Sequence, residues 1–244
     1  MMAPDAITIP AGETRRGIVV AMLGCMQILA WGSTFYLLPV LARPIVEDTG
    51  WPYDRVMAGL ALGLLAAGIV SPRTGRLIGR HGGRRVLAGG ALLVALGLVI
   101  VASARSLPVY LAGWIALGAG MGASLYDAAF ATLGALYGTA ARGPIAAVTL
   151  YGGFASTVCW PLSAWLIEHA GWRGACFIYA AVVTIQSIWN WLIYLSGPQR
   201  ATTLLRRYVI IQLLRLRLRP FAGELLQIGV WSVVLVQLVR LHSR

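Results

Sequence analysis

Long blocks of apolar residues constrain this sequence more than any other feature. A helix needs roughly 20 apolar residues to cross a hydrocarbon core about 30 Å thick, and within lipid it must satisfy its own backbone hydrogen bonds. The apolar blocks of about this length are residues 17–42, 56–78, 86–104, 107–137, 144–168 and 174–195. They predict an all-α fold, a polytopic bundle of six transmembrane helices that has membrane lipid as a partner.

Charged residues are rare and stand between these blocks. They make up 11% of the chain, whereas an average soluble domain has about 25%. All 20 basic residues are arginines, and their position at the block ends is typical of membrane proteins, in which basic residues set the orientation. A nucleic-acid-binding protein would instead gather its basic residues on one solvated face, so we expect no nucleic acid partner.

The distribution of arginine predicts the topology. One side of the membrane would hold the larger set, which is Arg15, Arg16, Arg73, Arg76, Arg80, Arg84, Arg85, Arg142, Arg200, Arg206 and Arg207. The other side would hold Arg43, Arg55, Arg105 and Arg173, with most of the acidic residues. The arginine-rich side is the cytoplasmic one, so both termini are expected in the cytoplasm. The first block, about 25 residues long, exceeds the apolar core of a signal peptide and is expected to remain as the first helix.

Patterns typical of enzymes and metal sites do not occur in the sequence. There is no GxSxG, HExxH or P-loop pattern. The cysteines Cys25, Cys159 and Cys176 fall inside apolar blocks and form no CxxC pair, which is typical of buried packing residues. We therefore expect no catalytic residue, no metal and no cofactor.

The segment between the second and third blocks carries the most specific motif, a run of glycines and arginines within residues 71–85. Glycine permits a sharp reversal, and arginine holds such a turn in the cytoplasm and can cap helix carbonyls. The segment resembles the signature loop of the major facilitator superfamily. The residues at matching positions are Gly75, Arg80, Gly82, Arg84 and Arg85. Gly79 and Gly83 depart from the pattern, replacing an aspartate and an arginine, and an ordinary positive-inside hairpin is the alternative.

Weaker matches extend the resemblance over residues 17–197. They are the glycine ridge Gly118, Gly120 and Gly122, the pair Arg142-Gly143, and Gly171-Trp172-Arg173. The resemblance implies the amino-terminal six-helix half of a transporter, built as two inverted three-helix repeats in the bacterial inner membrane. It implies secondary active transport of a small solute by alternating access. The scarcity of charges inside the apolar blocks favours an organic molecule over an inorganic ion as that solute. It also implies a second six-helix half as partner, from a homodimer or a split partner chain. The alternative function is a non-transporting membrane scaffold or assembly subunit.

Polar residues deep inside the blocks are the candidates for a substrate or proton pathway, because ionisable groups at mid-membrane are costly and suggest function. Asp127 is the only carboxylate deep in the bundle, roughly 15 Å from the cytoplasmic end of its helix. The candidates are Asp127, Gln27, Trp31, Tyr126, Tyr151, Ser156 and Thr157. Alternatively, Asp127 is protonated or bonded to Ser124 or a tyrosine, and Gln27 forms only a packing hydrogen bond.

Composition changes near residue 198 and divides the chain into a polar lead at 1–16, the six-helix domain at 17–197 and a tail at 198–244. Leucine alternates with arginine at residues 214–219 of the tail, a pattern that does not suit a lipid-spanning helix. The tail is interpreted either as an out-of-frame continuation of the gene or as an amphipathic segment lying on anionic lipid. Residues 221–241 are apolar enough to form a weak seventh helix.

Overall fold

The computed structural model describes residues 11–216, whose regular structure is entirely helical, with no strand in that range. The elements are α1 (Ala11–Gly32), α2 (Leu37–Thr49), α3 (Tyr53–His81), α4 (Gly83–Ser103), α5 (Leu107–Ser124), α6 (Tyr126–Tyr137), the 3-10 turn η1 (Gly138–Ala141), α7 (Arg142–Gly153) and α8 (Ala155–Leu216). The all-α prediction is therefore confirmed. The chain divides into two compact units, Met1–Trp191 and Leu192–Arg244, and the bundle is the first of them. The seventh helix expected at 221–241 lies outside the described residues.

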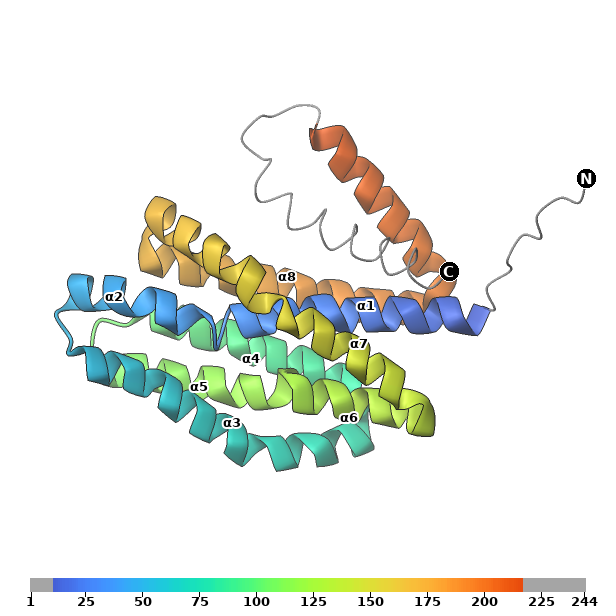
Figure 1. The fold of residues 1–244 in the computed structure, drawn as a ribbon, viewed down its shortest axis with the longest axis horizontal. Helices are drawn as coiled ribbons and strands as arrows, with labels where there is room; N and C mark the ends of the chain where they lie inside the picture. The colour runs from blue at the N-terminus through green and yellow to red at the C-terminus, as the bar shows by residue number, and fades with distance from the viewer. Residues whose placement is uncertain (1–10, 217–244) are drawn as a thin grey trace, which may run out of the picture. The chain divides into compact units, whose positions relative to one another are not determined.

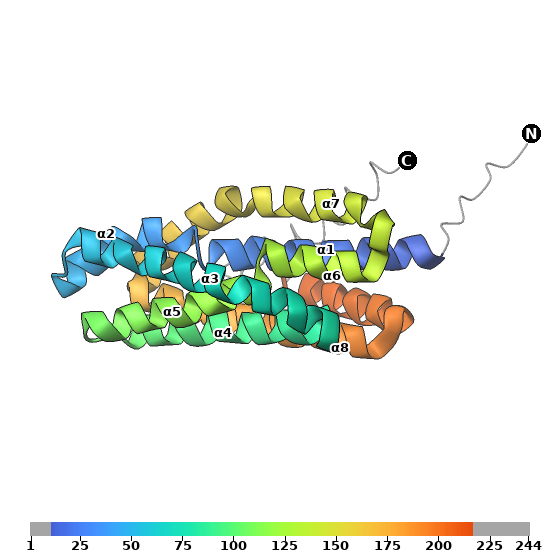
Figure 2. The ribbon, with the colours of Figure 1, turned by 90° about the horizontal axis from the view of Figure 1, so that it is seen from below.

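Four helical stretches of the described chain are long and apolar enough to cross a membrane. They are Val19–Thr49, Tyr53–His81, Gly83–Ser103 and Leu107–Ile188. The last is 82 residues long, several times the length that one crossing needs. Its chain reverses direction at η1 and again inside α8 (Figures 1 and 2). Gly138 in η1 and Gly171 in α8 have φ of 54° and 68°, the left-handed region that favours glycine and permits such turns.

Two connections are shorter than the sequence predicts. The first helix was expected to end at residues 43–44, but α2 continues through Pro44 to Thr49, because an internal proline removes a single backbone donor while the other turns stay bonded. Gly50, with φ of 70°, ends α2 and donates its N–H to the Val46 carbonyl at 2.9 Å. The turn expected over residues 79–85 is reduced to Gly82, with helix on both sides.

Three helices that the sequence predicts as continuous are interrupted. The interruptions are the turn at residues 33–36 between α1 and α2, Leu125 between α5 and α6, and Phe154 between α7 and α8. A local cause is visible at the first, where the Ser33 and Thr34 hydroxyls both donate to the Ala30 carbonyl and compete with the helical hydrogen bonds. The interruptions therefore separate α1 from α2, α5 from α6, and α7 from α8.

Small residues bring the helices of the bundle into close contact. Helices α3 and α5 pack side by side, as do α4 and α5, and α1 and α7. A Cβ atom on Gly118 would overlap the Gly63 backbone, and one on Gly122 would overlap the Ala67 carbonyl. Gly118 and Gly122 therefore pack α5 against α3, whereas Gly120, where a Cβ atom would overlap Val94, packs α5 against α4, as small residues do in membrane bundles.

Candidate functional site

Aromatic side chains meet near the three helix interruptions. The set, hereafter the aromatic cluster, is Trp31, Phe35, Tyr36, Tyr126, Phe130 and Trp160. Its members come from α1, from the turn that follows α1, from α6 and from α8. The ring centroids of Trp31 and Tyr126 are 5.1 Å apart, and those of Tyr36 and Trp160 are 6.4 Å apart. The cluster therefore links segments that are far apart in the sequence.

Tyr126, the first residue of α6, joins the cluster to α7. Its ring stacks on Phe130 with centroids 5.1 Å apart and an interplanar angle of 11°. Its hydroxyl donates to the Thr149 carbonyl of α7 at 3.1 Å. Gly152 makes room for this hydroxyl, because a Cβ atom there would overlap it. The position of the Tyr126 ring thus depends on a glycine one turn of helix further along α7.

Gln27 is fully buried and holds the end of α5. Its Nε2 donates to the carbonyl of Ser124, the last residue of α5, at 2.9 Å. This contact is the packing hydrogen bond that was one of the two interpretations of Gln27. Its Oε1 and the Trp31 Nε1 are buried without a hydrogen-bond partner among the described residues, and an unsatisfied buried polar atom costs about 1–3 kcal/mol.

A small cavity of about 10 Å³ lies beside this contact, at the lower limit of the room that one water molecule needs. Its lining residues come from α1, α4, α5 and α8 and are Met26, Ala30, Ala91, Val94, Ser124, Val183, Gln186 and Ser187. The cavity is too small for an organic solute.

Asp127 is exposed in the first turn of α6 and bonds to α3. Its Oδ2 accepts a hydrogen bond from the Ser71 hydroxyl at 2.7 Å. The alternative partners named from the sequence, Ser124 and a tyrosine, are not the ones observed, since Ser124 donates instead to the Gly120 carbonyl. Sequence reasoning missed Ser71, although a polar residue inside the apolar block 56–78 was its signal.

The candidates on the fifth apolar block lie apart from one another. Tyr151 is buried in α7 and packs against α1, where a Cβ atom on Gly24 would overlap its ring. Ser156 is half-buried and Thr157 exposed in the first turn of α8. Of the candidate residues, the structure brings Trp31 and Tyr126 into ring contact, while Tyr151 serves the packing of α7 on α1.

The sequence model of the Major Facilitator Superfamily matches residues 23–239. The chain belongs to this superfamily. The resemblance found in the signature loop is thereby confirmed, and the apolar helices of this facilitator chain are those of an integral membrane protein. The match also runs through residues 198–239 of the tail.

Two relatives show what kind of facilitator this chain resembles. Monocarboxylate transporter 11 of Mus musculus is 34% identical over 185 residues, which cover 71% of this chain and 39% of the mouse protein. A triacylglyceride transporter of Mycolicibacterium hassiacum is 27% identical over 201 residues, which cover 78% of this chain and 36% of that protein. The chain thus spans less than two fifths of either relative. Both are transporters and neither is named as an enzyme, which supports membrane solute transport in general.

The facilitator signature loop turns on Gly82, whose φ is 80°. Arg84, just after the turn, donates to the Trp191 carbonyl of α8 at 2.9 Å, and its guanidinium lies 4.8 Å from the Trp191 ring centroid. Gly75, Arg80 and Arg85 are exposed. The departure at Gly83 has a local reason, because a Cβ atom there would overlap the Thr132 side chain of α6.

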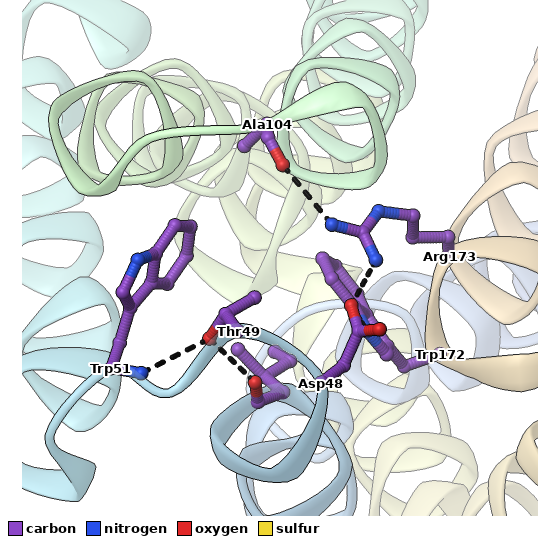
Figure 3. A network of polar contacts seen from close by, with 7 residues as sticks. Asp48, Thr49, Trp51, Ala104, Trp172 and Arg173 are labelled. Atoms are coloured by element: carbon purple, nitrogen blue, oxygen red, sulfur yellow. Dashed lines mark hydrogen bonds and ion pairs between the residues drawn. The ribbon is translucent and has the colours of Figure 1, made fainter.

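A second polar network joins the turns at the opposite end of the facilitator bundle (Figure 3). Asp48 accepts hydrogen bonds from the Trp172 indole at 3.1 Å and from Arg173, with which it forms an ion pair. Arg173 also donates to the Ala104 carbonyl at 3.4 Å and lies 4.2 Å from the Trp172 ring centroid. Three turns, from α2, α4 and α8, therefore meet at one arginine. No pairing of Asp48 could be predicted from the sequence, although Gly50-Trp51 after Asp48 and Gly171-Trp172 before Arg173 are the same dipeptide.

Proposed function

We propose that the chain is the amino-terminal half of a secondary transporter that crosses the membrane six times, as two repeats of three helices. The positive-φ glycines of the described residues support this arrangement. Gly50 and Gly82 stand 32 residues apart, with φ of 70° and 80°, and Gly138 and Gly171 stand 33 residues apart, with φ of 54° and 68°. Each pair brackets the middle helix of one proposed repeat, so the two repeats would have matching lengths.

The functional proposal rests on the positions of two of the helix interruptions. The first helix of each proposed repeat is interrupted, at residues 33–36 and at Leu125. Transporters bind their substrates near the middle of the membrane, where discontinuous helices occupy corresponding positions of the two repeats. Here Trp31 and Tyr126 of the aromatic cluster meet beside these two interruptions, and Asp127 follows Tyr126. In this proposal the bundle rocks between inward-open and outward-open states around that site.

A small organic solute suits the proposed site better than an inorganic ion. The aromatic rings offer apolar surface, and the Trp31 Nε1 is a hydrogen-bond donor with no partner within residues 11–216. The names of the two relatives make a monocarboxylate and a triacylglyceride the first solutes to test. Candidate pathway residues remain Asp127, Gln27, Trp31, Tyr126, Tyr151, Ser156 and Thr157.

Uptake into proteoliposomes tests the transport proposal. The full chain would be reconstituted, and initial uptake would be measured for a panel of labelled organic acids, lipids and amines. Asp127→Asn should reduce uptake of the transported solute about tenfold, because it removes the only deep carboxylate without changing side-chain size. Glu168→Gln is the matched control, since Glu168 is exposed at the far end of its apolar block. Equal uptake by the Asp127 variant over a range of pH would contradict the role of Asp127.

The transporter would need a second six-helix half, from another copy of this chain or from a split partner chain. This part of the proposal rests on the share of the relatives that the chain covers, 39% and 36%. The proposed location is the bacterial inner membrane, with both termini in the cytoplasm. Cross-linking in membranes, followed by mass measurement, would identify the partner. A chain that pairs with other membrane proteins but moves none of the solutes would favour the scaffold function instead.

A further inference from the structure

The charge of Asp127 has no counter-charge among the described side chains. The ion pairs found there are Arg43–Glu47 and Arg173–Asp48. Asp127 instead accepts a hydrogen bond from the neutral Ser71 hydroxyl, and it stands in the first turn of α6. A helix N-terminus and a hydroxyl donor both stabilise a carboxylate, but neither neutralises it. An exposed negative charge therefore remains on the face of α6 that looks toward α3.

An aromatic cluster begins at the neighbouring position of the chain. Tyr126 directly precedes Asp127, and its ring is 5.1 Å from both the Trp31 and the Phe130 ring centroids. Tyr36 and Trp160 extend the same cluster, and half of the Trp160 surface is exposed, at 50%. The face of an aromatic ring attracts cations, and several such rings together form the cages that hold quaternary ammonium groups.

Three segments around this face carry no positive charge, whereas α3 carries Arg73, whose guanidinium donates to the Ile69 carbonyl, and Arg76. Residues 17–42, 107–141 and 143–170 contain neither arginine nor lysine. A bound anion would be repelled by the Asp127 carboxylate and would find no basic side chain in these three segments. An organic cation would meet the opposite situation, with one carboxylate for its charge and several rings for its apolar part.

We propose that the face of α6 formed by Asp127, Tyr126 and the adjoining aromatic cluster binds an organic cation, a quaternary or protonated amine with an apolar substituent. The inference rests on the proposed transport function and narrows its solute class. The ammonium group lies against the Asp127 carboxylate and the Tyr126 ring, and the apolar substituent packs toward Trp31. Neither relative is named for a cationic solute, so this preference would distinguish the present chain from both.

Equilibrium binding of three probes of similar size tests this proposal. The probes are benzyltrimethylammonium, its uncharged isostere neopentylbenzene, and the anion phenylacetate, each measured on the full chain in lipid nanodiscs against empty nanodiscs. The cation should bind about ten times more tightly than either other probe. Asp127→Asn should weaken binding of the cation about tenfold and leave the neutral probe unchanged. Asp127→Glu should keep the preference for the cation, and Glu168→Gln should match the unmodified chain.

Binding of the three probes to the unmodified chain is enough to refute the proposal, so the test does not depend on whether a variant folds. Tightest binding of phenylacetate, or equal binding of all three probes, would refute it. Unchanged cation binding by a monodisperse Asp127→Asn variant would also refute it. Because the binding assay does not require transport, its result is independent of the result of the uptake experiment. Cation binding without uptake would support this site and count against the transport proposal, whereas uptake of an anion without cation binding would do the reverse.

Discussion

Gly82 forms the whole connection between α3 and α4, and its φ of 80° with ψ of 146° lies in a region that is open almost only to glycine. We predict that Gly82→Ala lowers the free energy of unfolding by about 1–3 kcal/mol, because alanine is strained there. Gly79→Ala is the matched control, since Gly79 lies inside α3 and a Cβ atom at either glycine meets nothing within 4 Å. The helical alanine should stabilise by about 1 kcal/mol. Thermal unfolding in detergent would reveal the difference, and equal midpoints for the two variants would contradict it.

Single residues of the candidate site were predictable where their chemistry conflicts with lipid. Asp127 and Gln27 could be selected because a carboxylate or an amide is rare inside an apolar block. Their partners could not be selected, because Ser71 and the Ser124 carbonyl come from other helices and meet these side chains only through packing. The same holds for Tyr151, which the sequence places at the right depth for a pathway but which the structure packs on α1.

Three arginines bond carbonyls at the ends of neighbouring helices, in addition to setting the orientation of the chain in the membrane. Arg16 donates to the Ala140 carbonyl, Arg84 to that of Trp191, and Arg173 to that of Ala104. Each guanidinium also lies over an aromatic ring, at 5.4, 4.8 and 4.2 Å from the ring centroid. The positive-inside rule predicts where arginines gather but not which of them cap a carbonyl, because the acceptor belongs to a helix distant in sequence.

Arg173 provides a test of these contacts, because lysine keeps the charge but loses the planar, stacked geometry of the guanidinium. We predict that Arg173→Lys lowers the midpoint of thermal unfolding, because lysine cannot bond Asp48 and the Ala104 carbonyl while stacking on Trp172. Arg105→Lys, in the neighbouring exposed turn, should change it little. Thermal unfolding of both variants in the same detergent measures the effect. If Arg105→Lys destabilised the protein as much as Arg173→Lys, the contacts of Arg173 with Asp48 would not be the cause of the destabilisation.

Most helices could be located from the apolar blocks, whereas their interruptions could not. Leucine at position 125 is not a helix breaker, so the local sequence does not signal that break, whereas the pair Gly152-Gly153 before Phe154 weakens the helix there. Tertiary contacts favour the observed geometry, since the Tyr126 hydroxyl occupies the space left by Gly152 and Gln27 caps the carbonyl of Ser124. The Ser33-Thr34 pair carries a local signal of a second kind, through hydroxyls that compete for a helix carbonyl.

At the scale of the whole molecule, the reversals inside the stretch Leu107–Ile188 decide how often the chain crosses the membrane. Three crossings within it would place residue 105 outside, residue 140 inside and residue 168 outside. Single cysteines at these positions, in a background with Cys25, Cys159 and Cys176 replaced by alanine, would report the side of each by labelling with a membrane-impermeant maleimide. We expect labelling of positions 105 and 168 in intact cells, and of position 140 only after permeabilisation, as for a control cysteine at position 85 of the arginine-rich signature loop. Labelling of position 140 from outside would rule out the two-repeat arrangement, because η1 must then lie on the same side as the turn before α5.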